Sequence, residues 1–228
     1  ERTTHKDVRD NILAVTDPNG ATTTYSYSTL GEIQKVRDAA GNETTMKYDG
    51  FGRRTEINNP DTGRTQFTYD SAGNMTRKIT AELGAKGKAI RYHYDHNRLV
   101  QVDYPFMDDV YYTYGSSGSG YNRAGRVYRV DNGAVSEELY FGKLGETIKS
   151  IKTIKDGTES TSYTTKYTFD NLGRMRTLTY PDGEILTYNY GHGGLLKSAV
   201  GETKTGRTVY LENMQYDAFG QRTYMKYG

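Results

Sequence analysis

The sequence predicts an all-β protein, a repetitive antiparallel meander of about 18 strands. The prediction rests on the stretch Phe67–Gly73, in which two aromatic residues alternate along a strand and lead into Asp70 and then a glycine. The same pattern recurs along the whole chain, with regular copies spaced 21 residues apart from Gly31 to Gly52 and from Gly52 to Gly73. A period in this range indicates a repeat architecture.

Each copy reads as a strand that ends in a tight turn, here called the aspartate turn. Aromatic residues at i and i+2 favour one face of a pleated strand, Asp favours the first position of a type I turn, and Gly follows the two central residues. We expect each turn glycine to have a positive φ. The motif residues of the clearest copies are Tyr48, Asp49 and Gly52; Tyr69, Asp70 and Gly73; Phe169, Asp170 and Gly173; and Tyr216, Asp217 and Gly220.

One copy lacks the glycine. Tyr94 and Asp95 run into Arg98 with one residue fewer than the regular spacing allows, so this unit requires a tighter turn. Degenerate copies surround Gly31, Gly145 and Gly194, and a Gly/Ser insertion follows Tyr114. Together these units make about nine repeats.

A second turn lies between successive aspartate turns, and it too consists of turn-forming residues. Pro presets φ, Asn and Asp cap the turn, and Gly accepts a positive φ. Tight turns join antiparallel neighbours, because a parallel pair needs a long crossover. Each repeat is therefore expected to contain two short strands. The second turns occur at residues 17–20, 38–41, 59–63, 131–133 and 181–183.

The apolar residues after each aspartate turn do not follow the period of a plain strand. They lie two and five residues beyond the glycine, as at Ile33 and Val36, and at Met175 and Leu178. Residues three apart face opposite sides of a regular strand. A β-bulge between them would reconcile the spacing.

Composition indicates a sheet with partly wet surfaces. The 228 residues include 22 Tyr, 26 Gly, no Trp and no Cys, and the mean hydropathy is −0.83. Eighteen strands at about 4.8 Å each would make a sheet roughly 85 Å wide, and twisted sheets of that width curl. We therefore expect a curved wall or spiral, in which tyrosine ladders pack along the strands.

The formal net charge is +2 and no basic block is present, so we expect no nucleic-acid partner. The sequence has no apolar run long enough for a membrane span and no visible signal peptide. Without Cys, disulfides and thiolate metal sites are excluded. We interpret residues 1–228 as one array and as a fragment of a longer one.

The pattern Y-x-Y-D-x-x-G-R-L resembles the RHS repeat, also called the YD repeat, as at Tyr48–Arg54 and Phe169–Met175. The resemblance covers essentially the whole chain. The family includes bacterial polymorphic toxins, the cocoon-forming components of insecticidal toxin complexes, and teneurins. It implies a long antiparallel sheet wound into a hollow shell, which in the toxins encloses a C-terminal toxic effector. The implied partners are the rest of the shell and that effector, and the implied location is secreted or at the cell surface.

An alternative function is a carbohydrate- or cell-surface-binding repeat module, with a glycan or receptor as partner. Short aromatic repeats present rings that stack on sugars, although the absence of Trp counts against this interpretation. We expect no enzymatic activity, no catalytic residue and no cofactor, because no nucleophile–base or paired-carboxylate spacing stands out.

Three clusters were considered as sites. His93, Asp95 and His96 could ligate a metal, but a repeat with chance histidines explains them better, and we expect no metal site. The second cluster consists of Asp103, Asp108 and Asp109, which could bind calcium, but their spacing matches no calcium-ligand pattern. The third consists of Ser116, Ser117 and Ser119 in the Gly/Ser insertion. No base lies at a spacing from these serines that would indicate nucleophilic catalysis.

Two further motifs have ordinary structural explanations. Asp17-Pro18-Asn19-Gly20 approaches the D-P-x-G-L motif of self-cleaving family members, but Ala21 replaces the Leu and the string lies at a second turn. Arg53, Arg126 and Arg174 follow turn glycines and could form a cargo-contacting stripe. We favour a repeating Asp–Arg pair or solvated edge charges instead.

Overall fold

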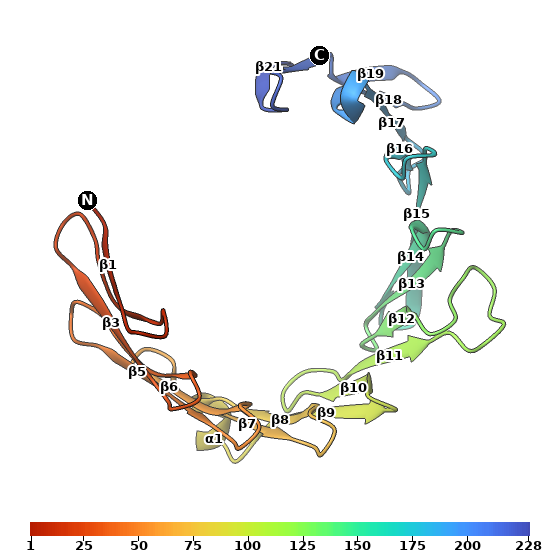
Figure 1. The fold of residues 1–228 in the computed structure, drawn as a ribbon. Coiled ribbons are helices and arrows are strands. Elements are labelled where there is room, and N and C mark those ends of the chain that lie inside the picture. Colours follow the sequence, from red (N-terminus) through yellow and green to blue (C-terminus); the bar gives the residue numbers. More distant parts are fainter. The chain divides into compact units, whose positions relative to one another are not determined.

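The structure is a computed structural model that describes residues 1–228. It contains 21 β-strands, one five-residue helix α1 (Ala81–Ala85) and a short 3-10 turn η1 (His192–Gly194) (Figure 1). Strands β1 to β19 form an antiparallel meander, and β20 and β21 form a separate hairpin. The chain divides into two compact units, residues 1–109 and 110–228, which we describe in turn. No helix has the length and apolar character that crossing a bilayer requires.

In the first unit, each strand pairs antiparallel with the next one along the chain. The helix α1 lies in the lengthened loop between β8 and β9, where the Thr80 hydroxyl caps it. The strands are β1 (Thr3–Lys6), β2 (Ile12–Thr16), β3 (Thr22–Tyr27), β4 (Ile33–Arg37), β5 (Glu43–Tyr48), β6 (Arg54–Asn59), β7 (Gly63–Tyr69), β8 (Met75–Ile79), β9 (Ile90–Asp95) and β10 (Arg98–Asp103).

The second unit repeats this plan with longer central strands and ends in the separate hairpin. Its strands are β11 (Val110–Tyr114), β12 (Val127–Asp131), β13 (Val135–Phe141), β14 (Thr147–Asp156), β15 (Glu159–Phe169), β16 (Met175–Thr179), β17 (Ile185–Tyr190), β18 (Leu196–Glu202), β19 (Arg207–Leu211), β20 (Asn213–Tyr216) and β21 (Arg222–Lys226).

The all-β meander is confirmed, but the strand count is higher than the expected 18 for two reasons. A tenth hairpin, β1–β2, turns at Asp7–Asp10, where Lys6 stands in place of the motif tyrosine and Asp10 adopts φ 68° in place of a glycine. In addition, one repeat strand is split at Glu212 into β19 and β20.

Cross-strand pairing separates the sheet of the first unit into two chemically different faces. On one face, Tyr25 lies opposite Val36 and Met46 opposite Ile57. On the other, Lys47 lies opposite Glu56, and their side chains form an ion pair at 3.0 Å. We call these the tyrosine face and the polar face.

A β-bulge accompanies every aspartate turn. In β3–β4, Tyr27 pairs with Ile33 while Ser26 pairs with Lys35, so Gln34 is the extra residue. The same one-residue shift occurs in every other hairpin closed by an aspartate turn. The bulge places Ile33 and Val36 on the same face, which explains the three-residue apolar spacing seen in the sequence.

Each unit is a single layer of strands with a sparse core (Figure 1). The buried apolar residues are few for this length, and no large side chain is fully buried. The main cluster packs partly buried neighbours around Leu186, Ala199 and Leu211. Since most domains bury a face of a sheet against a second layer, the stability of this sheet must come mainly from contacts between neighbouring strands.

Candidate functional site

The aspartate turn is the feature that the structure repeats most faithfully. In the copy at residues 70–73, the Gly73 amide donates to the Asp70 carbonyl at 3.2 Å, and the Asp70 amide donates to the Asn74 carbonyl at 2.9 Å. These bonds, with Gly73 at φ 92°, are those of a type I turn followed by a left-handed glycine. The predicted positive φ is confirmed at all four motif glycines, with Gly52 at 75°, Gly173 at 75° and Gly220 at 78°.

The aspartate side chain caps its own turn. Asp49 Oδ1 accepts hydrogen bonds from the amides of Phe51 and Arg53 at 2.9 and 3.0 Å, and its Oδ2 accepts one from Arg53 Nε at 2.7 Å. Asp170 and Arg174 repeat this arrangement. The predicted Asp–Arg pair is therefore present in both turns. Arg126 belongs to an irregular loop and instead donates to the Gly145 carbonyl at 2.8 Å.

Hydrogen bonds of this kind lower the pKa of Asp70 and of Asp170 below the ordinary value of an aspartate. The main cause is the side chain four residues on, which is Asn74 for Asp70 and Arg174 for Asp170, and backbone amides add to it. A carboxylate with a lowered pKa stabilises the fold above its unfolded pKa, and this contribution is lost as the pH falls through its folded pKa.

We therefore expect Asp70 to titrate below about 3.9, the value of an unperturbed aspartate. Asn74→Ala removes the largest cause, so the pKa of Asp70 should rise toward that value. Carboxyl chemical shifts followed by NMR between pH 2 and 6 would measure both. The interpretation fails if Asp70 titrates at its ordinary value in the unaltered chain, or if Asn74→Ala leaves it unmoved.

The turn without glycine is the tighter turn predicted from the spacing. His96 and Asn97 form a two-residue connection between β9 and β10, with φ values of 48° and 62°. The two histidines considered as metal ligands contact different carboxylates. His93 Nε2 lies 2.8 Å from an Asp103 oxygen, and His96 Nδ1 lies 2.6 Å from an Asp95 oxygen. No group of three or more His, Asp or Glu side chains is placed to share a metal ion.

The other candidate clusters hold loops in place. Asp109 accepts the Tyr104 amide at 3.0 Å, and Asp103 accepts the Gln101 side chain at 2.7 Å. In the insertion, the Ser119 amide donates to the Ser116 carbonyl at 3.1 Å. Asp17 Oδ1 accepts the amides of Asn19 and Ala21, as in the other capped turns.

In five hairpins, a tyrosine hydroxyl bridges the hairpin to the one before it. Tyr48 Oη donates to the Ile33 carbonyl at 2.9 Å, and Ile33 is the residue that pairs with Tyr27 in the preceding hairpin. The strands β4 and β5 pair only near the second turn, so this carbonyl lies where their ladder has ended. We call this gap between consecutive hairpins a seam. The same bridge joins Tyr27 to Ile12, Tyr69 to Arg54, Tyr94 to Met75 and Tyr190 to Met175.

The residue that follows the turn glycine adds a second link between repeats. The guanidinium of Arg53 lies 4.9 Å from the ring centre of Tyr69, and its Nη1 donates to the Asp70 carbonyl at 3.0 Å. Arg174 stacks on Tyr190 in the same way, at 4.5 Å. Arg9, which precedes the glycine position of its turn, donates to the Thr29 carbonyl at 3.0 Å. These three arginines couple their turns to the next turn along the chain.

Three seams in the second unit lack the tyrosine bridge, and each has a different structure. At the first, the insertion covers Phe141: the Phe141 amide donates to the Tyr121 carbonyl at 3.2 Å. The adjacent Arg123 packs against the rings of Tyr128 and Tyr140, at 4.5 and 4.1 Å. Tyr121 itself has φ 57°, a strained conformation for a bulky residue. The insertion is therefore anchored to the sheet.

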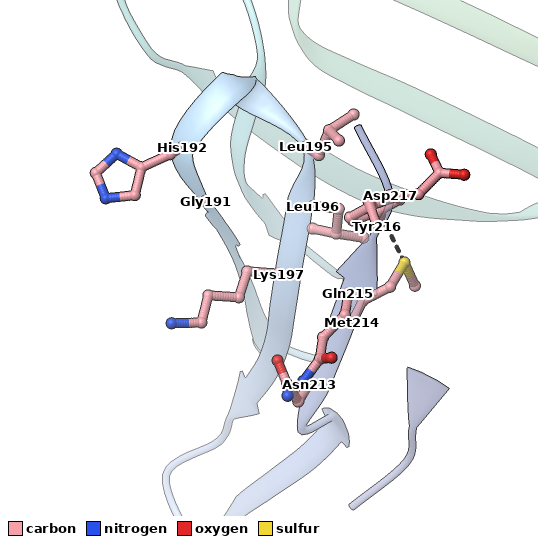
Figure 2. A pocket seen from close by; sticks show the side chains of 10 residues that line it. All are labelled: Gly191, His192, Leu195, Leu196, Lys197, Asn213, Met214, Gln215, Tyr216 and Asp217. Atoms are coloured by element: carbon pink, nitrogen blue, oxygen red, sulfur yellow. Dashed lines mark hydrogen bonds between the residues drawn. The ribbon is translucent and has the colours of Figure 1, made fainter. Parts of the chain in front are cut away.

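The other two unbridged seams are open grooves. At the seam between β14 and β15, Phe169 lacks the hydroxyl that forms the bridge elsewhere. An apolar groove of about 500 Å³ lies there between Leu144 and Phe169. At the seam between β18 and β20, the Tyr216 hydroxyl points to the Met214 sulfur, and a cavity of about 460 Å³ remains (Figure 2). Its lining includes Leu196 and Met214 as well as His192 and Lys197.

Comparison with known proteins explains this geometry. The RHS repeat matches residues 7–43, 27–64 and 48–86, which are overlapping windows within the first unit. Residues 7–86 therefore carry RHS repeats. No curated protein gives a significant sequence match. The second unit repeats the same turns and bulges, and Tyr190 forms one tyrosine bridge there.

Solved structures show the same fold over nearly the whole chain. TcdB2-TccC3 aligns with 99% of the chain at a TM-score of 0.82 and 20% identity. TcdB2-TccC3 without its hypervariable C-terminal region gives 0.81, and the Tc holotoxin pore of Photorhabdus luminescens gives 0.80, both at 20% identity and 99% coverage. The chain spans only 13% of the length of each of these chains.

Proposed function

We propose that this RHS segment is part of the wall of a hollow shell that encloses an effector. The observation that carries the proposal is the alignment of 99% of the chain with TcdB2-TccC3 at a TM-score of 0.82. Because the chain spans 13% of that protein, the wall would be completed by further repeats of one continuous array. Residues 1–228 would act as a single stretch of it.

The geometry suits a wall. Each strand contacts mainly its sequence neighbours, so the array grows by adding hairpins without needing a second layer. No buried side-chain nitrogen or oxygen lacks a hydrogen-bond partner, although both faces of the sheet meet solvent. Twist accumulates over a sheet of this many strands, and we expect a longer array to wind into a spiral with a wet interior.

The chemistry of the effector would lie outside this segment. The side chains considered for catalysis or metal binding hold turns and loops, and the clusters around His93 and Asp103 are taken up by local hydrogen bonds. We therefore assign residues 1–228 a structural, non-enzymatic role. Delivery of an enclosed effector implies a protein that acts outside the cell that makes it or at its surface.

The sugar-binding alternative has less support in this geometry. The bridging tyrosines are at most partly exposed, and their hydroxyls are used on backbone carbonyls. A glycan array probed with the purified chain would test this alternative. A sugar-binding module would bind glycans, and substitution of its exposed tyrosines would abolish that binding.

Protease protection tests the enclosure. The complete gene product would be treated with proteinase K before and after mild denaturation, and effector peptides would be followed by mass spectrometry. We expect the effector to survive in the native protein and to be degraded once the wall is opened. As a control, the effector expressed alone should be degraded without denaturant. An effector cleaved equally fast in the native product would contradict enclosure.

A further inference from the structure

Two loops that depart from the repeat lie next to each other in the first unit. The lengthened loop between β8 and β9 carries α1, and residues 104–109 follow β10. The two loops touch where Lys86 Nζ lies 5.0 Å from the ring centre of Phe106. Within the second loop, Asp109 Oδ1 accepts the Tyr104 amide at 3.0 Å. Both loops stand where other repeats have a tight turn, so this part of the unit has a structure of its own.

A polar pocket of about 220 Å³ lies between these loops. Lys88 and Arg91 line it together with Asp103 and Tyr104, and the buried Ala89 also contributes to its lining. At about 30 Å³ for each water, the pocket has room for about seven waters. Pockets for drug-sized ligands are larger, at about 300–1,000 Å³. The size and the lining therefore suit a small polar molecule.

The polar face beside this pocket departs from the charge pairing of the strands before it. On β5 to β7, Lys47 and Arg64 both form ion pairs with Glu56, which lies on the strand between them. On β8 and β9, by contrast, Arg77 lies directly opposite Arg91 in the strand register. Two guanidiniums thus face each other where a cation and a carboxylate would be expected.

These two guanidiniums have no partner within the chain. Directly opposed side chains have Cβ atoms about 4.5–5.5 Å apart, and like charges in such a pair are destabilising. Neither Arg77 nor Arg91 forms a side-chain hydrogen bond, an ion pair or a ring contact. Asp103 lies opposite Arg91 on the other side, but its oxygens contact His93 Nε2 at 2.8 Å and Gln101 Nε2 at 2.7 Å instead.

An oxyanion would complete this arrangement. A guanidinium presents five N–H donors and binds carboxylate or phosphate oxygens in pairs. Lys88, whose side chain also has no ion-pair partner, adds a third positive charge at the pocket. Asp103 retains acceptor positions, because an ionised carboxylate has about four lone-pair sites. An acceptor in the same pocket favours a ligand that carries hydroxyl groups besides its acid group.

We propose that this pocket binds a small hydroxylated oxyanion, either a sugar acid or a sugar phosphate. Arg91 and Lys88 hold its acid group from the lining of the pocket, and Arg77 approaches the same group from the adjacent strand. Asp103 accepts a hydrogen bond from one of its hydroxyls. The bound anion relieves the repulsion between the two guanidiniums. This site is independent of the proposed shell, which neither requires it nor follows from it.

An NMR titration of the 228-residue chain tests the site with four probes. Glucuronate and glucose 1-phosphate are each compared with the ion that lacks hydroxyls, acetate or inorganic phosphate. At least one of the two sugar ligands should shift the amide signals of residues 87–91 with a Kd at or below about 1 mM. It should bind at least about tenfold more tightly than its parent ion, and the ligand that does so identifies the acid group as carboxylate or phosphate.

Arg91→Gln should weaken this binding at least about tenfold, because a hydrogen bond to a charged group is lost. Without ligand, the urea unfolding midpoint should stay unchanged or rise, since one of two opposed charges is gone. Lys47→Gln is the matched control: it removes the same charge from the same face, but four strands away, about 19 Å from β9 and beyond the screening length. The affinity of this variant should not change.

Three results would overturn the proposal. The first is the absence of saturable binding by either sugar ligand. The second is binding of both sugar ligands no tighter than that of acetate and inorganic phosphate. The third is an equal loss of affinity in Arg91→Gln and Lys47→Gln, which would show that only the overall charge of the chain attracts the anion.

Discussion

Replacement of Tyr27, Tyr48, Tyr69 and Tyr94 together by Phe is expected to lower the free energy of unfolding of the first unit by about 4 kcal/mol. Each hydroxyl donates to a backbone carbonyl of the preceding hairpin at 2.8 to 3.0 Å. A hydrogen bond of this kind contributes about 1 kcal/mol net. The four bridges lie at different seams, so their effects should be nearly additive. Urea unfolding monitored by circular dichroism would measure the loss.

The matched control removes hydroxyls that have no such role. Tyr25 lies on the tyrosine face, and Tyr188 is a partly buried counterpart in the second unit. Neither hydroxyl bridges a seam, and Tyr25→Phe and Tyr188→Phe should each change the free energy of unfolding by less than about 0.5 kcal/mol. If the four bridging substitutions together cost no more than these controls, the tyrosine bridge does not hold the repeats together.

Gly73→Val is expected to destabilise its hairpin by about 1–2 kcal/mol or more, because an L-residue is strained in the left-handed region. Gly73 has φ 92°, and a side chain there would meet no atom within 4 Å, so the cost comes from the backbone alone. Since repeats contact mainly their neighbours, the damage should stay local. Hydrogen exchange would show amides of β7 and β8 losing protection before those of β3 and β4.

Gly50 supplies the control for this change. It lies in an equivalent turn, lacks a positive φ, and also has open space where a side chain would point. Gly50→Val should therefore be neutral or slightly stabilising, since it restricts only the unfolded chain. Equal losses for Gly50→Val and Gly73→Val would contradict a type I turn closed by a left-handed glycine.

The fold was largely predictable because its signals are local. Asp70 and Gly73 specify a turn through their own backbone preferences, and Tyr94–Arg98 requires a shorter turn simply by length. The hairpin at Asp7 was missed because its glycine position holds Asp10, which still adopts φ 68°. The spacing of Ile33 and Val36 indicated a bulge, but only the strand register located the extra residue at Gln34.

The contacts between repeats were not predictable in the same way. The Tyr48 hydroxyl donates to a carbonyl 15 residues earlier in the chain, and this acceptor lies where the β4–β5 ladder has already ended. The sequence shows many tyrosines but not the partners of their hydroxyls. Likewise, Tyr121 and Arg123 look like part of a Gly/Ser loop, whereas they anchor the insertion to β13. A signal was present in the periodic exchange of Tyr for Phe at residues 141 and 169.

Cryo-electron microscopy of the complete gene product tests the central claim most directly. The account predicts that residues 1–228 form one single-layered stretch of a closed wall, with continuous strand pairing into further repeats and effector density inside the enclosed space. A reconstruction in which this sheet encloses no volume and the effector lies outside it would contradict it.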